Sequence, residues 1–245
     1  MRKFFQIGFV FLCSAGATFA ADLSLIASST GGGNTTLNAH VAGNSCAAVS
    51  GASACGGKTA VNLHASGNST VNVAADSFGP ASVAESNVDV RTSHDSRADV
   101  TSFNQAHYGR SVNDLAAVAT HGGKVDIDQV TVGKQSDIHN TARGTATLGG
   151  NTKLVSTVIA NQSDVDISNR GSTVGRGARL EQEVLADVFR GNVSGNAVGS
   201  ATALKGAAVT KSQTVIQNKN VESKVRTTTS GCRGKATFTA DFRSN

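Results

Sequence analysis

The sequence predicts an all-β protein: a β-solenoid with strand–turn–strand rungs of about 27 residues, two stacked sheets and a thin Val/Ile/Leu/Ala core. Three observations predict this fold. Apolar residues recur every 27 residues, and they alternate with polar residues on both sides of Gly- and Asn-containing turns. The 245-residue chain also has 27 glycines and only 4 % aromatic residues. A thick core normally needs many aromatic side chains, so a thin core is expected.

Residues 1–20 are predicted to be a signal peptide. Two basic residues precede an apolar run from Phe4 to Ala17, and small residues prepare a cleavage site after Ala20. This run is too short to cross a bilayer and no later segment is long enough, so we expect no transmembrane segment. A lipoprotein signal at Cys13 is the alternative, but Leu12 before it is unusually large for one. The mature chain is therefore expected to pass through the periplasm and to be secreted, extracellular or at the cell surface.

Residues 21–58 are predicted to form an N-terminal rung that carries an insertion. This unit is about eight residues longer than 27, and the excess coincides with the small-residue segment between Cys46 and Cys55. An oxidising compartment favours a disulfide between these two cysteines, leaving Cys232 free or joined to another chain. A metal site is the rival interpretation, but no ligand-spaced His or Cys pair accompanies it, and we predict no metal.

Residues 59–229 form the predicted repeat region, in which apolar columns recur at the 27-residue interval. We expect these columns to face the core. They are Val73, Val100, Ile127 and Leu154; Val71, Ala98, Val125 and Thr152; Val61, Val88, Leu115 and Ala142; and Leu63, Val90, Ala117 and Gly144.

Two columns of turns separate the strands. Gly122-Gly123 and Gly149-Gly150 belong to the first column, and Lys134-Gln135-Ser136 belongs to the second, about half a period later. An isolated strand pair is marginally stable in water, whereas stacked copies bury a continuous core. In such a stack the strands lie about 4.8 Å apart and the sheets about 10 Å apart, which suits small and β-branched side chains.

The residues between the core columns are polar, as solvent-facing positions should be. One such column holds Thr70, Arg97, Lys124 and Asn151, and the next holds Asn72, Asp99, Asp126 and Lys153. Basic and acidic columns on one face attract diagonally, and the outward Asn, Asp and Ser side chains favour ladders along the stack. The segment from Leu180 to Phe189 could form a short helix, but its place in the repeat favours a strand.

No catalytic, cofactor-binding or metal-binding site is predicted, and we expect no enzyme activity. The columns His94/His121 and Asp137/Asp164 could bind a metal or transfer protons, but turn residues and solvated ladders are the simpler interpretation. Gly175-Arg176-Gly177 lacks the strand and helix of a nucleotide-binding loop. The formal charge of +5 is spread out without interleaved aromatics, so no nucleic-acid partner is expected.

The repeats resemble those of bacterial functional amyloids, the curlins and the Fap fibre subunits. VNLHASGNSTVNVAADS and TVIQNKNVESKV look most like curlin units, with apolar alternation on both sides of an amide-rich turn. A holdfast-type surface anchor built on similar repeats is also compatible. The resemblance implies self-assembly into fibres, biofilm or adhesive function, and a nucleator or outer-membrane secretion partner.

The leading functional hypothesis is a structural subunit of an extracellular cross-β fibre or adhesive biofilm matrix, assembled by end-to-end strand pairing. The alternative is a monomeric β-solenoid adhesin or surface anchor that binds a ligand along one face. A solenoid polysaccharide lyase is a distant third, because short turns leave no cleft. We place the assembly edges at Leu25 and Ile26 and, in the C-terminal strand or cap of residues 230–245, at Phe238 and Phe242.

Overall fold

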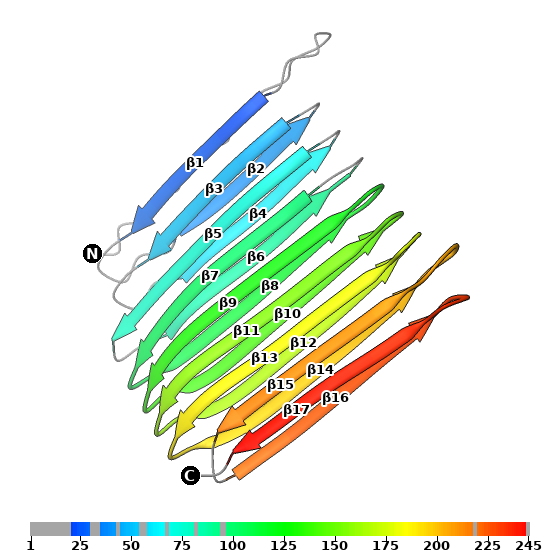
Figure 1. Cartoon of the computed structure of the whole chain (residues 1–245). Helices are drawn as coiled ribbons and strands as arrows, with labels where there is room; N and C mark the ends of the chain where they lie inside the picture. Colours follow the sequence, from blue (N-terminus) through cyan, green and yellow to red (C-terminus); the bar gives the residue numbers. More distant parts are fainter. Residues whose placement is uncertain are drawn as a thin grey trace.

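The predicted β-solenoid is confirmed. The computed structural model describes residues 21–29, 35–42, 45–53, 58–66, 69–80, 83–93, 97–217 and 220–243. Within these ranges the structure contains no helix. Seventeen strands form two parallel sheets. The chain alternates between the sheets, so that odd-numbered strands form one and even-numbered strands the other (Figure 1).

Sheet A contains the nine odd-numbered strands: β1 (Ala21–Ser29), β3 (Ser45–Ser53), β5 (Ser69–Pro80), β7 (Arg97–His107), β9 (Lys124–Lys134), β11 (Asn151–Asn161), β13 (Arg179–Phe189), β15 (Val209–Gln217) and β17 (Lys235–Arg243). Sheet B contains the eight even-numbered strands: β2 (Thr35–Ala42), β4 (Lys58–Ser66), β6 (Val83–Thr92), β8 (Arg110–Ala119), β10 (Asp137–Thr147), β12 (Asp164–Val174), β14 (Asn192–Thr202) and β16 (Asn220–Ser230). The segment from Leu180 to Phe189 is therefore strand, within β13.

The strand register has the predicted period. Val100 pairs with Ile127, and Ile127 pairs with Leu154, so successive rungs are offset by 27 residues. The offset grows to 28 between β11 and β13, where Thr152 pairs with Leu180. These small changes are absorbed in the turns, and the columns remain continuous.

In the N-terminal region the structure contains a further strand of the stack where an insertion was predicted. The segment Ser45–Ser53 is strand β3, which pairs with β1 and with β5 over nine residues each. Leu25 pairs with Val49 and Val49 with Val73, so the rungs here repeat every 24 residues. The extra length therefore completes a further, shorter rung. Cys46 lies in β3, and the predicted disulfide itself cannot be placed because Cys55 lies outside the described residues.

The predicted core columns occupy the space between the sheets. Thirteen of their members have at most 3 % of their surface exposed: Val61, Leu63, Val88, Val90, Ala98, Val100, Leu115, Ala117, Val125, Ile127, Ala142, Thr152 and Leu154. Val71 and Val73 share these columns by register, and their side chains lie outside the described part of the structure. Alternation along each strand thus separates core positions from solvent positions.

Glycines on one sheet make room for large side chains on the other. Gly144, Gly171 and Gly199 form one inward column of sheet B. A Cβ atom on Gly144 would lie 2.8 Å from Leu154 Cδ2, and Cβ atoms on Gly171 and Gly199 would lie 2.4 and 2.3 Å from the Leu180 methyl groups. The thin core is therefore filled by pairing small residues with large ones across the sheets.

A band of buried polar side chains divides the core. On one side lies the apolar cluster around Ile127 and Leu115, and on the other the cluster around Ile167 and Val184. Between them lie buried amides and hydroxyls, which are mainly Asn104, Asn113, Gln129, Thr131, Asn140, Ser156, Asn169, Gln182 and Ser212. The core therefore contains more than the predicted Val, Ile, Leu and Ala.

The polar band is joined by hydrogen bonds between rungs and between sheets. Gln129 Nε2 donates to the carbonyl oxygens of Asn113 and Thr141, at 3.3 and 2.5 Å. The Ser156 hydroxyl lies 2.9 Å from Gln129 Oε1 and 2.6 Å from Asn169 Oδ1. Because the carbonyls belong to sheet B and Gln129 to sheet A, these bonds tie the two sheets together.

Candidate assembly edges and the groove along one turn column

The two ends of the stack expose sheet edges. Strands β1 and β17 are the outermost strands of sheet A, and β2 and β16 are those of sheet B (Figure 1). Each has a neighbour in its sheet on one side only among the described residues. The N–H and C=O groups on the other side form a template that can pair with another strand.

The C-terminal end exposes core positions as well as backbone. Phe238 pairs with Ser212, whose side chain is fully buried in an inward column. Phe238 itself is 65 % exposed, because β17 is the last described strand of its sheet. The inward face of β17 is therefore open. The side chain of Phe242, the other predicted edge residue, lies outside the described residues.

The N-terminal edge strand continues the core register. Leu25 pairs with Val49, which is 2 % exposed, whereas Ile26 pairs with the half-buried Ser50. Neighbouring residues in a strand point to opposite faces. Of the two predicted edge residues, the register therefore assigns Leu25 to a core column and Ile26 to an outer column.

A groove runs along the turns that connect sheet A to sheet B. Tyr108, Gln135, Gln162 and Arg190 occupy equivalent positions with φ between 50° and 56°. The following residue in each turn is glycine or serine. A Cβ atom on Gly191 would lie 1.9 Å from the Ser163 carbonyl oxygen, so this turn requires glycine.

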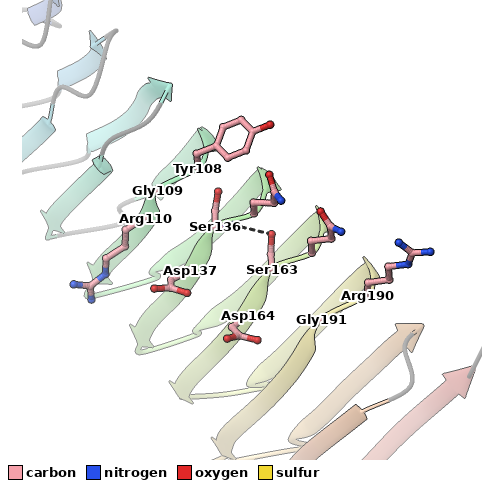
Figure 2. A pocket seen from close by; sticks show the side chains of 11 residues that line it. Tyr108, Gly109, Arg110, Ser136, Asp137, Ser163, Asp164, Arg190 and Gly191 are labelled. Carbon is pink, nitrogen blue, oxygen red and sulfur yellow. Dashed lines mark hydrogen bonds between the residues drawn. The ribbon is translucent and has the colours of Figure 1, made fainter.

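The groove has a volume of about 950 Å³ and mixed polar walls (Figure 2). Asp137 pairs with Asp164, and these exposed carboxylates lie between Arg110 and Asn192 in one column. Asn192 Nδ2 donates to Asp164 Oδ1 at 2.9 Å. The predicted Asp137/Asp164 column thus exists as an open ladder, and its neighbours supply charge and amide groups rather than an enclosed catalytic pocket.

Serines support the floor of the groove. The backbone N–H of Ser136 donates to Ser163 Oγ at 3.2 Å, as Figure 2 shows. The hydroxyl of Ser136 donates to the carbonyl oxygens of Lys134 and Ala106, and that of Ser163 donates to the carbonyl of Asn161. Both side chains are buried and serve the turn, so neither is positioned as a nucleophile.

The outer face of sheet A has a polar half and an apolar half. At the strand starts, Arg97 Nε lies 2.6 Å from Asp99 Oδ2. This hydrogen bond and the charge of Asp99 raise the pKa of Arg97. Further along the strands an outer apolar strip crosses five strands, and it consists of Phe103, Val130, Val132, Ile159, Leu185 and Val215. Ile159 is 52 % exposed.

The outer face of sheet B is mainly polar on β10 and β12, although Val118 of β8 and Val198 of β14 also face outward. Arg143 Nη2 lies 3.6 Å from Asp114 Oδ2, and His139 Nδ1 lies 3.9 Å from Asp166 Oδ2. Among the described residues no group of three or more His, Cys, Asp or Glu side chains is arranged to hold a metal ion. Of the predicted His94/His121 column, His121 lies in an exposed turn, and His94 lies outside the described residues.

Comparisons with known proteins give no relative. No protein-family model matches the chain, and neither the curated proteins nor the solved structures contain a significant match. In the part of the chain that the structure describes, no helix has the length and apolar character needed to cross a membrane.

Proposed function

We propose that this protein is a structural subunit of an extracellular cross-β fibre or adhesive matrix, assembled end to end by strand pairing. The observation that carries the proposal is the open C-terminal end, where β16 and β17 have unpaired edges and Phe238 is 65 % exposed in a core column. The N-terminal end offers the complementary edges of β1 and β2. A second copy placed there continues both sheets.

Assembly of this kind uses the interactions that already hold the rungs together. Each added strand pairs its backbone in parallel, and each added inward residue extends a core column. Burial of Phe238 at the junction removes a large apolar side chain from water, which stabilises the contact by about 2 kcal/mol. The signal peptide, the extracellular location and the involvement of a nucleator or secretion partner belong to the same proposal.

The test is fibre formation by the exported chain and by two variants matched in chemistry. Phe238→Asp places a charge in the open core column, whereas Phe189→Asp changes a phenylalanine that is 60 % exposed on the outer face of sheet A. We expect the unmodified chain and Phe189→Asp to form fibres with a reflection near 4.8 Å. We expect Phe238→Asp to delay or abolish them. A chain that remains monomeric for days at neutral pH, seen by electron microscopy, contradicts the proposal.

A second candidate function is a monomeric adhesin or surface anchor that binds a ligand along one face. The outer apolar strip favours it, because such a strip on one sheet of a two-sheet stack marks a binding surface. Replacing Ile159 or Leu185 with Ser should then weaken attachment to surfaces while leaving the chain monomeric. Under the fibre proposal the same changes leave polymerisation intact.

A further inference from the structure

The two ends of the molecule differ in a way that determines how copies can join. The described chain from Ala21 to Arg243 contains an odd number of strands, with nine in sheet A and eight in sheet B. Both the first and the last of these described strands, β1 and β17, belong to sheet A. Each interior strand packs across the core against the strands before and after it, so the sheets are offset by half a rung. Sheet A therefore projects beyond sheet B at both ends.

A copy added without rotation leaves a gap. In that arrangement β17 pairs with β1 of the next copy, and sheet A is continuous. Sheet B then has one strand position empty between β16 and the next copy's β2. The empty position leaves two strand edges unpaired and the inward face of β17 covered by β16 alone, and both are costly in a thin core.

A copy added with a half-turn about the stacking axis leaves no gap. The half-turn exchanges the positions of the two sheets, so β1 of the next copy pairs with β16 and its β2 pairs with β17. Strand direction is preserved, because successive strands run in opposite directions (Figure 1) and the half-turn reverses each strand as it exchanges the sheets. All new pairs are therefore parallel, as they are within the molecule.

The half-turn also covers the exposed phenylalanine. Phe238 lies on the inward face of β17, where the next strand position across the core is vacant. In the rotated arrangement the next copy's β1 fills that position, and β1 carries Leu25 in a core column. The exposed Phe238 thus meets an apolar strand.

We propose that successive subunits are related by a half-turn, so that sheet A of one copy continues as sheet B of the next. This inference rests on the proposed end-to-end assembly. It predicts a subunit rise of eight and a half strand spacings, or about 41 Å, instead of nine spacings, or about 43 Å. It also predicts that the outer apolar strip alternates between the two sides of the fibre.

Cysteine pairs test which strands meet. The register places Thr239 of β17 in the column of Asp128, the fifth residue of β9. Thr36 of β2 lies in the column of Thr141, the fifth residue of β10, so a half-turn brings Thr239 and Thr36 level. Both residues are exposed. Without rotation, Thr239 lies level with Ile26 of β1. Two variants, each with one new cysteine in a Cys232→Ser background, are mixed before polymerisation, so that a disulfide between the two new cysteines always joins two copies.

We expect Thr239→Cys to cross-link with Thr36→Cys at least tenfold more than with Ile26→Cys. Electron cryomicroscopy of unmodified fibres should show the rise of eight and a half spacings with a half-turn added to the twist of the stack. The N-terminus of the exported chain is checked by mass spectrometry, because β1 must be the first strand. Cross-linking to Ile26→Cys, or a rise of nine spacings without rotation, overturns the half-turn and leaves the fibre proposal standing. Absence of fibres overturns both.

Discussion

Two neighbouring inward positions of strand β9 show that this core has two kinds of interior. Ile127 is fully buried among apolar side chains, between Val100 and Leu154 in its column. Gln129, two residues later on the same face, is equally buried but binds two backbone carbonyls and a serine hydroxyl. The first position contributes apolar burial, and the second contributes hydrogen bonds between sheets. Period-two alternation therefore determines which way a side chain faces, and the facing sheet determines which chemistry is tolerated there.

The largest expected loss of stability follows from placing a charge at the apolar position, Ile127. Ile127→Asp buries an unpaired carboxylate among apolar side chains, and we expect it to cost about 4 kcal/mol or more, enough to prevent folding of the surrounding rungs. Asp126→Asn, one residue earlier on the outer face, should change stability by less than about 0.5 kcal/mol. Urea denaturation of freshly purified, unpolymerised chain measures both. Equal losses at the two positions would mean that the alternation has been misassigned.

The alternation and the 27-residue period could be predicted from the sequence because Val100, Ile127 and Leu154 are apolar and evenly spaced. The burial of Gln129 could not be predicted, because its hydrogen-bond partners come from the facing sheet and become apparent only when the two sheets are placed together. A single period also concealed the 24-residue rungs, although Leu25 and Val49 already carry that spacing.

In the groove, too, some features could be predicted from the sequence and others could not. The Asp137/Asp164 column was predicted from like residues at one interval. Tyr108 and Arg190 share the neighbouring column, but their side chains have no chemistry in common. Only the repeated left-handed backbone position connects them, and sequence alone does not reveal it.

The second expected effect concerns the fit between the sheets next to the apolar position. Gly171→Val places its Cβ atom 2.4 Å from Leu180 Cδ1, and Leu180 is fully buried, so the overpacking should cost about 2–3 kcal/mol. Adding Leu180→Ala should recover part of that loss, with a coupling of at least about 1 kcal/mol in a double-mutant cycle. Ser172→Val, on the outer face, is the control. Strict additivity of the first two changes would show that the glycine and the leucine do not share one space.

A third test compares satisfied and unsatisfied amides within the polar band. Gln129→Leu removes three hydrogen bonds of a buried amide and should cost about 1–2 kcal/mol. The side-chain nitrogen and oxygen of Asn113 are buried without a hydrogen-bond partner among the described residues, so Asn113→Val should be neutral or stabilise by up to about 1 kcal/mol. Urea midpoints of the two variants decide the matter. If Asn113→Val is as damaging as Gln129→Leu, an ordered water satisfies Asn113.

The smallest expected effect lies outside the core, at the pair between Lys58 and Glu85, whose Nζ and Oε2 atoms are 2.5 Å apart on neighbouring strands of sheet B. Burial raises the pKa of Glu85, but hydrogen bonds from Lys58 and Asn87 and the charges of Lys58 and Arg110 outweigh it, so the pKa lies below its ordinary value. A carboxylate with a lowered pKa contributes stability above its unfolded pKa and loses it as pH falls through the folded one.

Glu85→Gln should therefore reduce stability at pH 7 by less than about 1 kcal/mol and leave it unchanged near pH 2. Urea denaturation at both pH values measures this difference, with Glu183→Gln as the control for loss of one carboxylate. A deficit that persists undiminished at pH 2 would assign the effect of the substitution to packing rather than to charge.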